Sequence, residues 1–148
     1  TVAPTGDSLY DQVMAQQGIL TQPFNRGFVE DGEVKISVVG GEVTLARKHI
    51  IEGDITGSPI VAFDRSTGVR MFKYVPSDEE AELALRVFHE VNKRTPAHYV
   101  RVDIAGGQVS EVEVLNPNHC TSPSFGLDFD PERVENHYRR ILQGFEKR

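Results

Sequence analysis

The chain lacks the cysteines on which several classes of protein depend. It contains one, Cys120, in 148 residues, and a single thiol can form neither an internal disulfide nor a zinc site that needs a second sulfur ligand. As a nucleophile, Cys120 would need a paired base. Its neighbour His119 would point to the opposite side of an extended chain. The sequence therefore gives little support to a disulfide, a zinc site or a catalytic thiol.

Long apolar runs and clusters of basic residues are also missing. No apolar stretch approaches the roughly 18 residues of a membrane span, and no charged-then-apolar leader opens the chain. The net charge of −6 and the pI near 5.3 argue against nucleic acid or an anionic membrane as a partner. The remaining composition, 39% hydrophobic and 26% charged, is ordinary for a globular protein. We expect one soluble, cytoplasmic domain over residues 1–148.

Three segments have the periodicity of amphipathic helices. The first covers residues 8–17 and stops at a glycine. The second opens on a capping box at 77–80 and runs to about Lys93, with apolar residues on one face. The third starts at Asp130 with a proline in its first position and runs toward a basic end.

Short alternating or apolar runs between these helices predict strands. They cover residues 19–24, 34–39, 42–46, 60–63, 69–74, 98–104 and 109–117. A Gly–Gly turn joins 34–39 to 42–46 as a hairpin, whereas residues 49–59 have no periodicity and predict a loop. The sequence thus predicts an α+β fold, an antiparallel sheet flanked by helices.

The last predicted hairpin carries four charged residues in strands that otherwise look buried. Arg101 and Asp103 share one strand face, and Glu111 and Glu113 share another. A three-residue loop at 106–108 would set Asp103 opposite Glu111 and Arg101 opposite Glu113. The other faces are apolar and can bury against a core: Val100, Val102, Ile104, Val112 and Val114.

Three carboxylates at cross-strand spacing repel one another unless a cation sits between them. A metal ion would explain the pattern. The alternative is a solvated sheet face on which Arg101 and Glu113 form a surface ion pair. A polar loop at 116–126 follows the hairpin, and loops at strand ends often carry function.

Several motifs resemble the second half of an ATP-grasp domain, the fold of glutathione synthetase, D-alanine–D-alanine ligase and the ribosomal-protein glutamate ligases. They are Arg101–Val102–Asp103, Glu111–Val112–Glu113, Pro117 and Ser122–Pro123, preceded by Ile19–Phe24 and Gly32–Glu33. The resemblance implies the ATP-grasp C-terminal lobe. It also implies that Arg101 steadies the transferred phosphoryl group. The implied magnesium ligands are Asp103, Glu111, Glu113 and Asn116.

The family uses two magnesium ions with ATP, and manganese is the alternative ion. Carboxylate oxygens suit such hard cations. By the same resemblance, the hinge that hydrogen-bonds adenine is Gln22, Pro23, Phe24 and Asn25, and Glu33 is the acid that binds the ribose hydroxyls. Lys48 approaches the phosphates, with Lys35 and Arg47 as weaker candidates. His119 and Ser122 lie in the loop where related enzymes place the acceptor substrate. His89 and His137 are expected to be packed or surface residues.

The chain departs from the family at its start. Nothing matches the substrate domain or the first nucleotide-binding lobe, and Ala3 stands where the family has a lysine. We expect part of a longer enzyme, and a partner chain or a homo-oligomer that completes the site remains open. The leading hypothesis is an ATP-dependent carboxylate–amine ligase acting on small substrates through an acyl phosphate. The alternatives are a non-catalytic nucleotide- and metal-binding module and a structural domain with an acidic face.

Overall fold

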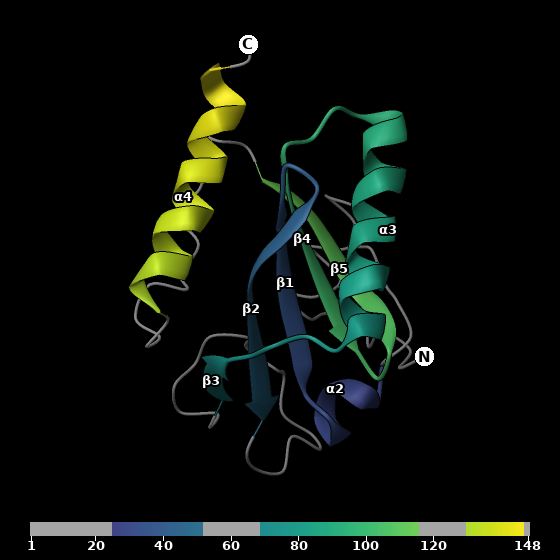
Figure 1. Ribbon diagram of the computed structural model, residues 1–148. Coiled ribbons are helices and arrows are strands. Elements are labelled where there is room, and N and C mark those ends of the chain that lie inside the picture. The colour runs from purple at the N-terminus through teal and green to yellow at the C-terminus, as the bar shows by residue number, and fades with distance from the viewer. Residues whose placement is uncertain (1–24, 52–68, 116–129, 147–148) are drawn as a thin grey trace, which may run out of the picture.

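A five-stranded antiparallel sheet forms the centre of the protein (Figure 1). The computed structural model describes residues 25–51, 69–115 and 130–146. The sheet order is β3-β2-β1-β4-β5. In chain order the elements are α2 (Gly27–Glu30), β1 (Glu33–Val39), β2 (Glu42–Ile51), β3 (Val69–Lys73), α3 (Asp78–Arg94), β4 (Tyr99–Ala105), β5 (Gln108–Leu115) and α4 (Pro131–Glu146). The predicted α+β class is confirmed.

Two pairs of glycines turn the chain between neighbouring strands. Gly40 and Gly41 join β1 to β2, and Gly106 and Gly107 join β4 to β5, all with positive φ between 55° and 84°. Two central residues with positive φ make the turn whose twist matches paired strands. The predicted hairpins therefore form. The helix predicted at 8–17 and the strands predicted at 19–24 and 60–63 lie outside the described residues.

Helix α3 covers one face of the sheet. The capping box that opens it is present, because Ser77 and Glu80 each hydrogen-bond the other's backbone N–H. Ala84 and Phe88 pack from the helix onto the sheet. The sheet contributes the even-numbered, buried residues of its central strands: Val34, Ile36, Val38, Ala46, Val100, Val102 and Ile104. Burying this apolar surface is the main stabilising contribution to the fold.

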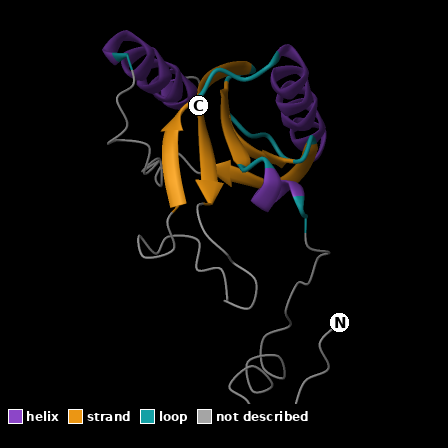
Figure 2. Cartoon of the chain, turned by 90° about the horizontal axis from the view of Figure 1, so that it is seen from below, coloured by secondary structure: helices purple, strands orange, loops and turns teal. Residues whose placement is uncertain are grey.

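Helix α4 lies on the opposite side of the sheet (Figure 2). Ile141 and Tyr138 of α4 pack against Val39 and Tyr99, which are odd-numbered residues at the end of β1 and the start of β4. The helix thus covers the end of this face that adjoins the β1–β2 turn. The odd-numbered residues farther along the same strands are mostly charged.

Three sequence predictions need correction. Residues 49–51 belong to β2, where they pair with β3, rather than to a loop. The β4–β5 turn has two residues rather than three, and an irregularity after Asp103 compensates for the difference. Val112 and Val114 are 40% and 48% exposed instead of joining the core, because they lie on β5, the last strand of the described part of the sheet.

In the described ranges, no helix is long and apolar enough to cross a membrane.

Candidate functional site

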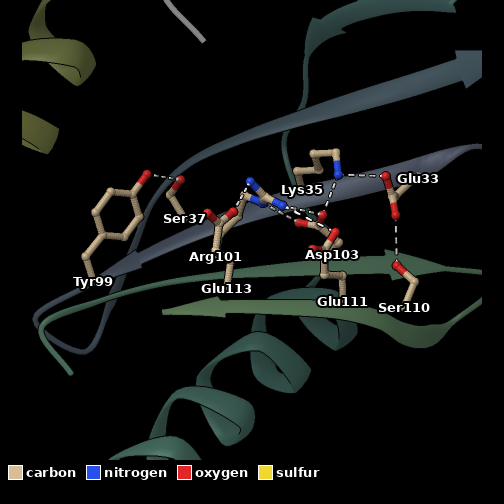
Figure 3. Close-up of polar contacts among 9 residues, drawn as sticks. All are labelled: Glu33, Lys35, Ser37, Tyr99, Arg101, Asp103, Ser110, Glu111 and Glu113. Carbon is tan, nitrogen blue, oxygen red and sulfur yellow. Dashed lines mark hydrogen bonds and ion pairs between the residues drawn. The ribbon is translucent and has the colours of Figure 1, made fainter. Parts of the chain in front are cut away.

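Charged side chains from three neighbouring strands gather on the face opposite α3, and we call them the ionic cluster (Figure 3). Its members are Glu33 and Lys35 on β1, Arg101 and Asp103 on β4, and Glu111 and Glu113 on β5. Alternate residues of a strand share one face. The antiparallel register aligns Lys35 with Asp103, Asp103 with Glu111, and Arg101 with Glu113. The last two pairs are those predicted from the sequence.

Asp103 is the centre of the ionic cluster. Its side chain is completely buried. Oδ1 accepts a hydrogen bond from Arg101 Nε at 2.8 Å, and Oδ2 accepts one from Arg101 Nη2 at 3.0 Å. Lys35 Nζ donates to the same Oδ2. Two cations of the chain therefore compensate the buried carboxylate, as burial of a charge requires.

Arg101 links this buried centre to the accessible side of the cluster. Its Nη1 lies 2.5 Å from Glu113 Oε2, and its Nη2 lies 3.5 Å from Glu111 Oε2. Burial opposes the charge of Arg101, yet the hydrogen bonds to Asp103 and the surrounding carboxylates hold its pKa above the ordinary value. The side chains of Glu111 and Glu113 are 60% and 43% exposed. Arg101 thus stays charged with a carboxylate on each side.

Glu33 is held from two directions. Lys35 Nζ lies 2.8 Å from Oε2, and Ser110 donates a hydrogen bond to Oε1 at 2.9 Å. Ser110 was not expected from the sequence. It faces the cluster because it is the extra residue of the β5 irregularity, and a bulge brings neighbouring side chains to the same side. The sequence feature that could have indicated Ser110 is a serine in a charged strand close to a Gly–Gly turn.

Lys48 lies on the other face of the sheet from the ionic cluster. It pairs with Val34, so it points to the α3 side, where its Nζ sits 5.4 Å from the centre of the Tyr74 ring. Its neighbours in β2, Arg47 and His49, face the ionic cluster instead. The structure therefore brings Arg47, a weaker sequence candidate, to the polar face and separates Lys48 from it, because one residue along a strand reverses the face.

Arg47 and His49 are buried, with 5% and 6% of their surfaces exposed. Burial and the nearby Arg101 lower the pKa of Arg47. Burial also lowers the pKa of His49 to about 4, and the charges of Arg47 and Lys35 act in the same direction. His49 is therefore neutral at physiological pH.

Asn25 lies beside the β4–β5 turn. Its Nδ2 donates to Ala105 O at 2.9 Å, and its Oδ1 accepts from Gly27 N at 2.9 Å. The side chain therefore ties the start of α2 to the end of β4, near the ionic cluster. The other predicted site residues lie outside the described part of the chain: Gln22, Pro23, Phe24, Asn116, His119 and Ser122.

Among residues 25–51, 69–115 and 130–146, no group of three or more His, Cys, Asp or Glu side chains is arranged to hold a metal ion. The repulsion expected between Asp103, Glu111 and Glu113 is relieved by Arg101, which contacts all three. Glu111 and Glu113 remain accessible carboxylates on one strand face. They fit magnesium when a ligand supplies further oxygens, since this ion is usually held by one or two carboxylates plus substrate phosphates.

No protein-family model matches the sequence. No curated protein matches it either.

Two solved structures are similar to it in fold. One is an ATP-grasp ligase, PsnB, complexed with a minimal precursor, with 14% identity and a TM-score of 0.46 over 75% of this chain and 33% of that one. The other is D-alanine–D-alanine ligase from Bacillus anthracis complexed with ATP, with 14% identity and a TM-score of 0.41 over 78% of this chain and 41% of that one. The chain thus spans less than half of either ligase. The first of these structures is of a member of the family that the hairpin motifs resemble.

Proposed function

We propose that the chain is the phosphate- and metal-binding part of an ATP-dependent carboxylate–amine ligase of the ATP-grasp type. The observation that carries the proposal is the contact of Arg101 with three carboxylates from two adjacent strands. Phosphoryl transfer is catalysed mainly by positioning and by neutralising charge. A fixed cation next to accessible carboxylates supplies both requirements.

In this proposal the exposed side of the cluster receives the phosphates. Glu111 and Glu113 would hold magnesium, for which ATP would supply further oxygen ligands. Arg101 neutralises the transferred group. Asp103 keeps Arg101 and Lys35 in place, and Asp103 and Asn116 stay predicted metal ligands. The bound metal would contribute charge neutralisation at the phosphate oxygens.

The nucleoside would lie toward Glu33 and Asn25. Lys35 and Ser110 hold the Glu33 carboxylate, whose side chain is 10% exposed, in one orientation. In this proposal its remaining lone pairs would accept hydrogen bonds from the ribose hydroxyls. Asn25 is bonded to Ala105, close to the same edge of the sheet. The predicted adenine hinge at 22–25 ends at this residue.

The proposed reaction has two steps. A carboxylate oxygen of the first substrate attacks the γ-phosphorus of ATP, so that an acyl phosphate forms and ADP leaves. The amine of the second substrate then attacks the acyl carbon, and the carbon–oxygen bond breaks to release phosphate and a proton. Lys35 and Arg101 stabilise the negative charge of the first step. A cytoplasmic location stays a prediction.

A binding module without turnover is the second candidate. The specific observation in its favour is Asp103, a predicted metal ligand that is buried and already bonded to Lys35 and Arg101. A carboxylate in this state positions cations of the chain. The module would bind magnesium and ATP through Glu111 and Glu113 alone.

Calorimetric titration with ATP, with and without magnesium, tests both candidates. We expect binding that magnesium strengthens. The double substitution Glu111→Gln with Glu113→Gln should remove the magnesium dependence, because amides do not carry the charge that the ion requires. Glu90→Gln is the matched control, since Glu90 is an exposed carboxylate on α3 that pairs only with Lys93 among the described residues.

Absence of ATP binding to the wild-type chain would contradict both candidates. Unchanged magnesium dependence in the double variant would show that the metal site lies elsewhere. Release of phosphate from ATP on addition of amino-acid pairs separates the ligase from the binding module. Arg101→Met should abolish that release while ATP binding weakens less.

A further inference from the structure

His49 has an unsatisfied polar atom inside the protein. The residue is 6% exposed, and its Nε2 has no hydrogen-bond partner in the described part of the structure. Buried polar atoms in native proteins are nearly always paired, and each exception needs an explanation. The function proposed above does not use His49.

The second buried histidine of the sheet's polar side provides the contrast. His137 is 1% exposed, and its Nδ1 is bonded to Thr44 Oγ1 at 2.7 Å. Its ring also makes edge contacts with Tyr99 and Tyr138. His137 therefore has a structural role that its contacts explain, and His49 does not.

The surroundings of His49 favour an anionic partner. Glu33 lies directly across from it on β1, and Arg47 is its neighbour on the same face of β2. The positive charges of Arg47, Lys35 and Arg101 disfavour a proton on its ring and outweigh the Asp103 carboxylate, which favours one. These same charges attract a negatively charged group. A neutral imidazole can donate from Nε2–H to such a group without adding a further positive charge.

We propose that His49 is a binding residue of the polar face and donates a hydrogen bond from Nε2 to an anionic oxygen of the ligand. That oxygen belongs either to a phosphate of the nucleotide or to a carboxylate substrate. The identity of the ligand rests on the proposed function, whereas the assignment of a ligand contact to His49 rests on the unpaired buried nitrogen.

Two substitutions separate the hydrogen bond from the shape of the side chain. His49→Phe keeps a ring of similar size but has no N–H, and His49→Leu is a second removal variant should the first fail to fold. His49→Gln places an amide N–H near the position of Nε2. His137→Leu is the matched control, because it removes a buried neutral histidine from the same side of the sheet.

Binding is measured by calorimetry with four probes: ATP with magnesium, pyrophosphate, succinate and adenosine. His49→Phe should weaken the anionic probe that contacts His49 by about 10- to 100-fold, as expected for a hydrogen bond to a charged group. His49→Gln should stay within about threefold of the wild type. Adenosine binding should not change. His137→Leu should bind every probe like the wild type once folded.

Stability without ligand gives an independent measurement. Removing an unpaired buried nitrogen relieves a desolvation penalty. His49→Phe should therefore unfold at the same or a higher denaturant concentration than the wild type. His137→Leu, which breaks a bond, should unfold at a lower one. A loss of stability in His49→Phe equal to that in His137→Leu would overturn the inference in favour of a structural role.

Each binding outcome has one meaning. Weakening of ATP and pyrophosphate assigns the contact to phosphate, and weakening of succinate alone assigns it to a carboxylate. If wild type binds pyrophosphate or succinate but not ATP, and His49→Phe weakens that binding, the proposed ligase function fails and the His49 inference holds. Equal affinities of wild type and His49→Phe for every anionic probe, or no binding of any probe, would overturn the inference.

Discussion

The two ends of the sheet face opposite α3 are built from the same strands but differ in how their polar groups are satisfied. At the end covered by α4, the Tyr99 hydroxyl meets Ser37 Oγ at 3.1 Å, and His137 meets Thr44. At the other end, buried charges pair with one another in the ionic cluster, and the His49 Nε2 has no described partner. The first end pairs its hydroxyl and imidazole groups within the chain and leaves Arg140 Nε as its unpaired buried atom among the described residues, whereas the second leaves the His49 imidazole nitrogen unpaired beside the buried charges.

The largest expected effect comes from the centre of the ionic cluster. Asp103→Ala leaves Lys35 and Arg101, whose side chains are only 10% and 18% exposed, without their shared carboxylate. Removing one member of a buried charge network costs about 3–5 kcal/mol. We expect the free energy of unfolding to fall by this amount, as measured by denaturant titration.

Glu113→Gln is the control for that measurement. It removes another carboxylate partner of Arg101, but one whose side chain is 43% exposed, so the expected loss is about 0–1 kcal/mol. Similar losses of stability in Asp103→Ala and Glu113→Gln would mean that the buried and the exposed side of the ionic cluster do not differ in solvation.

Acid should destabilise both ends of the face through their histidines. Burial lowers the pKa of His49 and of His137 to about 4, from an ordinary value of 6.5. Below pH 6.5 the unfolded chain binds protons that the folded chain does not, so this stability is present above 6.5 and is lost as the pH falls toward 4. Between pH 6.5 and pH 5.5, each histidine should lower the free energy of unfolding by about 1 kcal/mol.

Thermal unfolding between pH 6.5 and 5.5 measures this loss before most carboxylates titrate. His49→Phe should reduce the slope by about half, because one of the two histidines is gone. A melting temperature that stays constant across this pH range would contradict the lowered pKa values of His49 and His137.

A smaller effect is expected from the hydroxyl pair at the α4 end. Tyr99→Phe removes the bond to Ser37 while keeping the ring, and should cost about 1 kcal/mol. Adding Ser37→Ala should recover part of the loss, because the buried serine oxygen is then no longer left unpaired. Additive losses in the double variant would show that the two hydroxyls act independently.

The smallest effect should come from the solvent side of α4. Glu135 and Arg139 form an ion pair at 2.6 Å, but their side chains are 70% and 65% exposed. Glu135→Gln should change stability by less than about 0.5 kcal/mol. A loss comparable to that of Tyr99→Phe would mean that exposed charges matter more to this protein than its burial pattern indicates.

The strand pairing of the charged hairpin was predictable because two patterns agree there. Alternation assigned Arg101 and Asp103 to one face, and the Gly–Gly pair fixed where the chain turns. The continuation of β2 through His49 was not predictable. Its last residues include charged and polar side chains, and they are held in the sheet by β3, which follows a long stretch later in the chain.

Burial was the least predictable property of the site. Asp103 and Glu111 look equivalent in the sequence, yet Asp103 is fully buried and the Glu111 side chain is 60% exposed. The difference arises because β4 lies between β1 and β5, whereas the described sheet ends at β5. Three-dimensional placement also decides which cations lie between the carboxylates, namely Arg101 and Lys35. It likewise decides that the His49 nitrogen is left unpaired.

The β-bulge at Ser110 places one extra residue in β5 of the charged hairpin. In the structure, a two-residue turn followed by a bulge brings Glu111 opposite Asp103. A three-residue loop with no bulge would bring Glu111 to the same position. The charged pairs thus keep their partners under either turn length. The β4–β5 connection can therefore lose the extra residue of the bulge during evolution without moving the carboxylates that it connects.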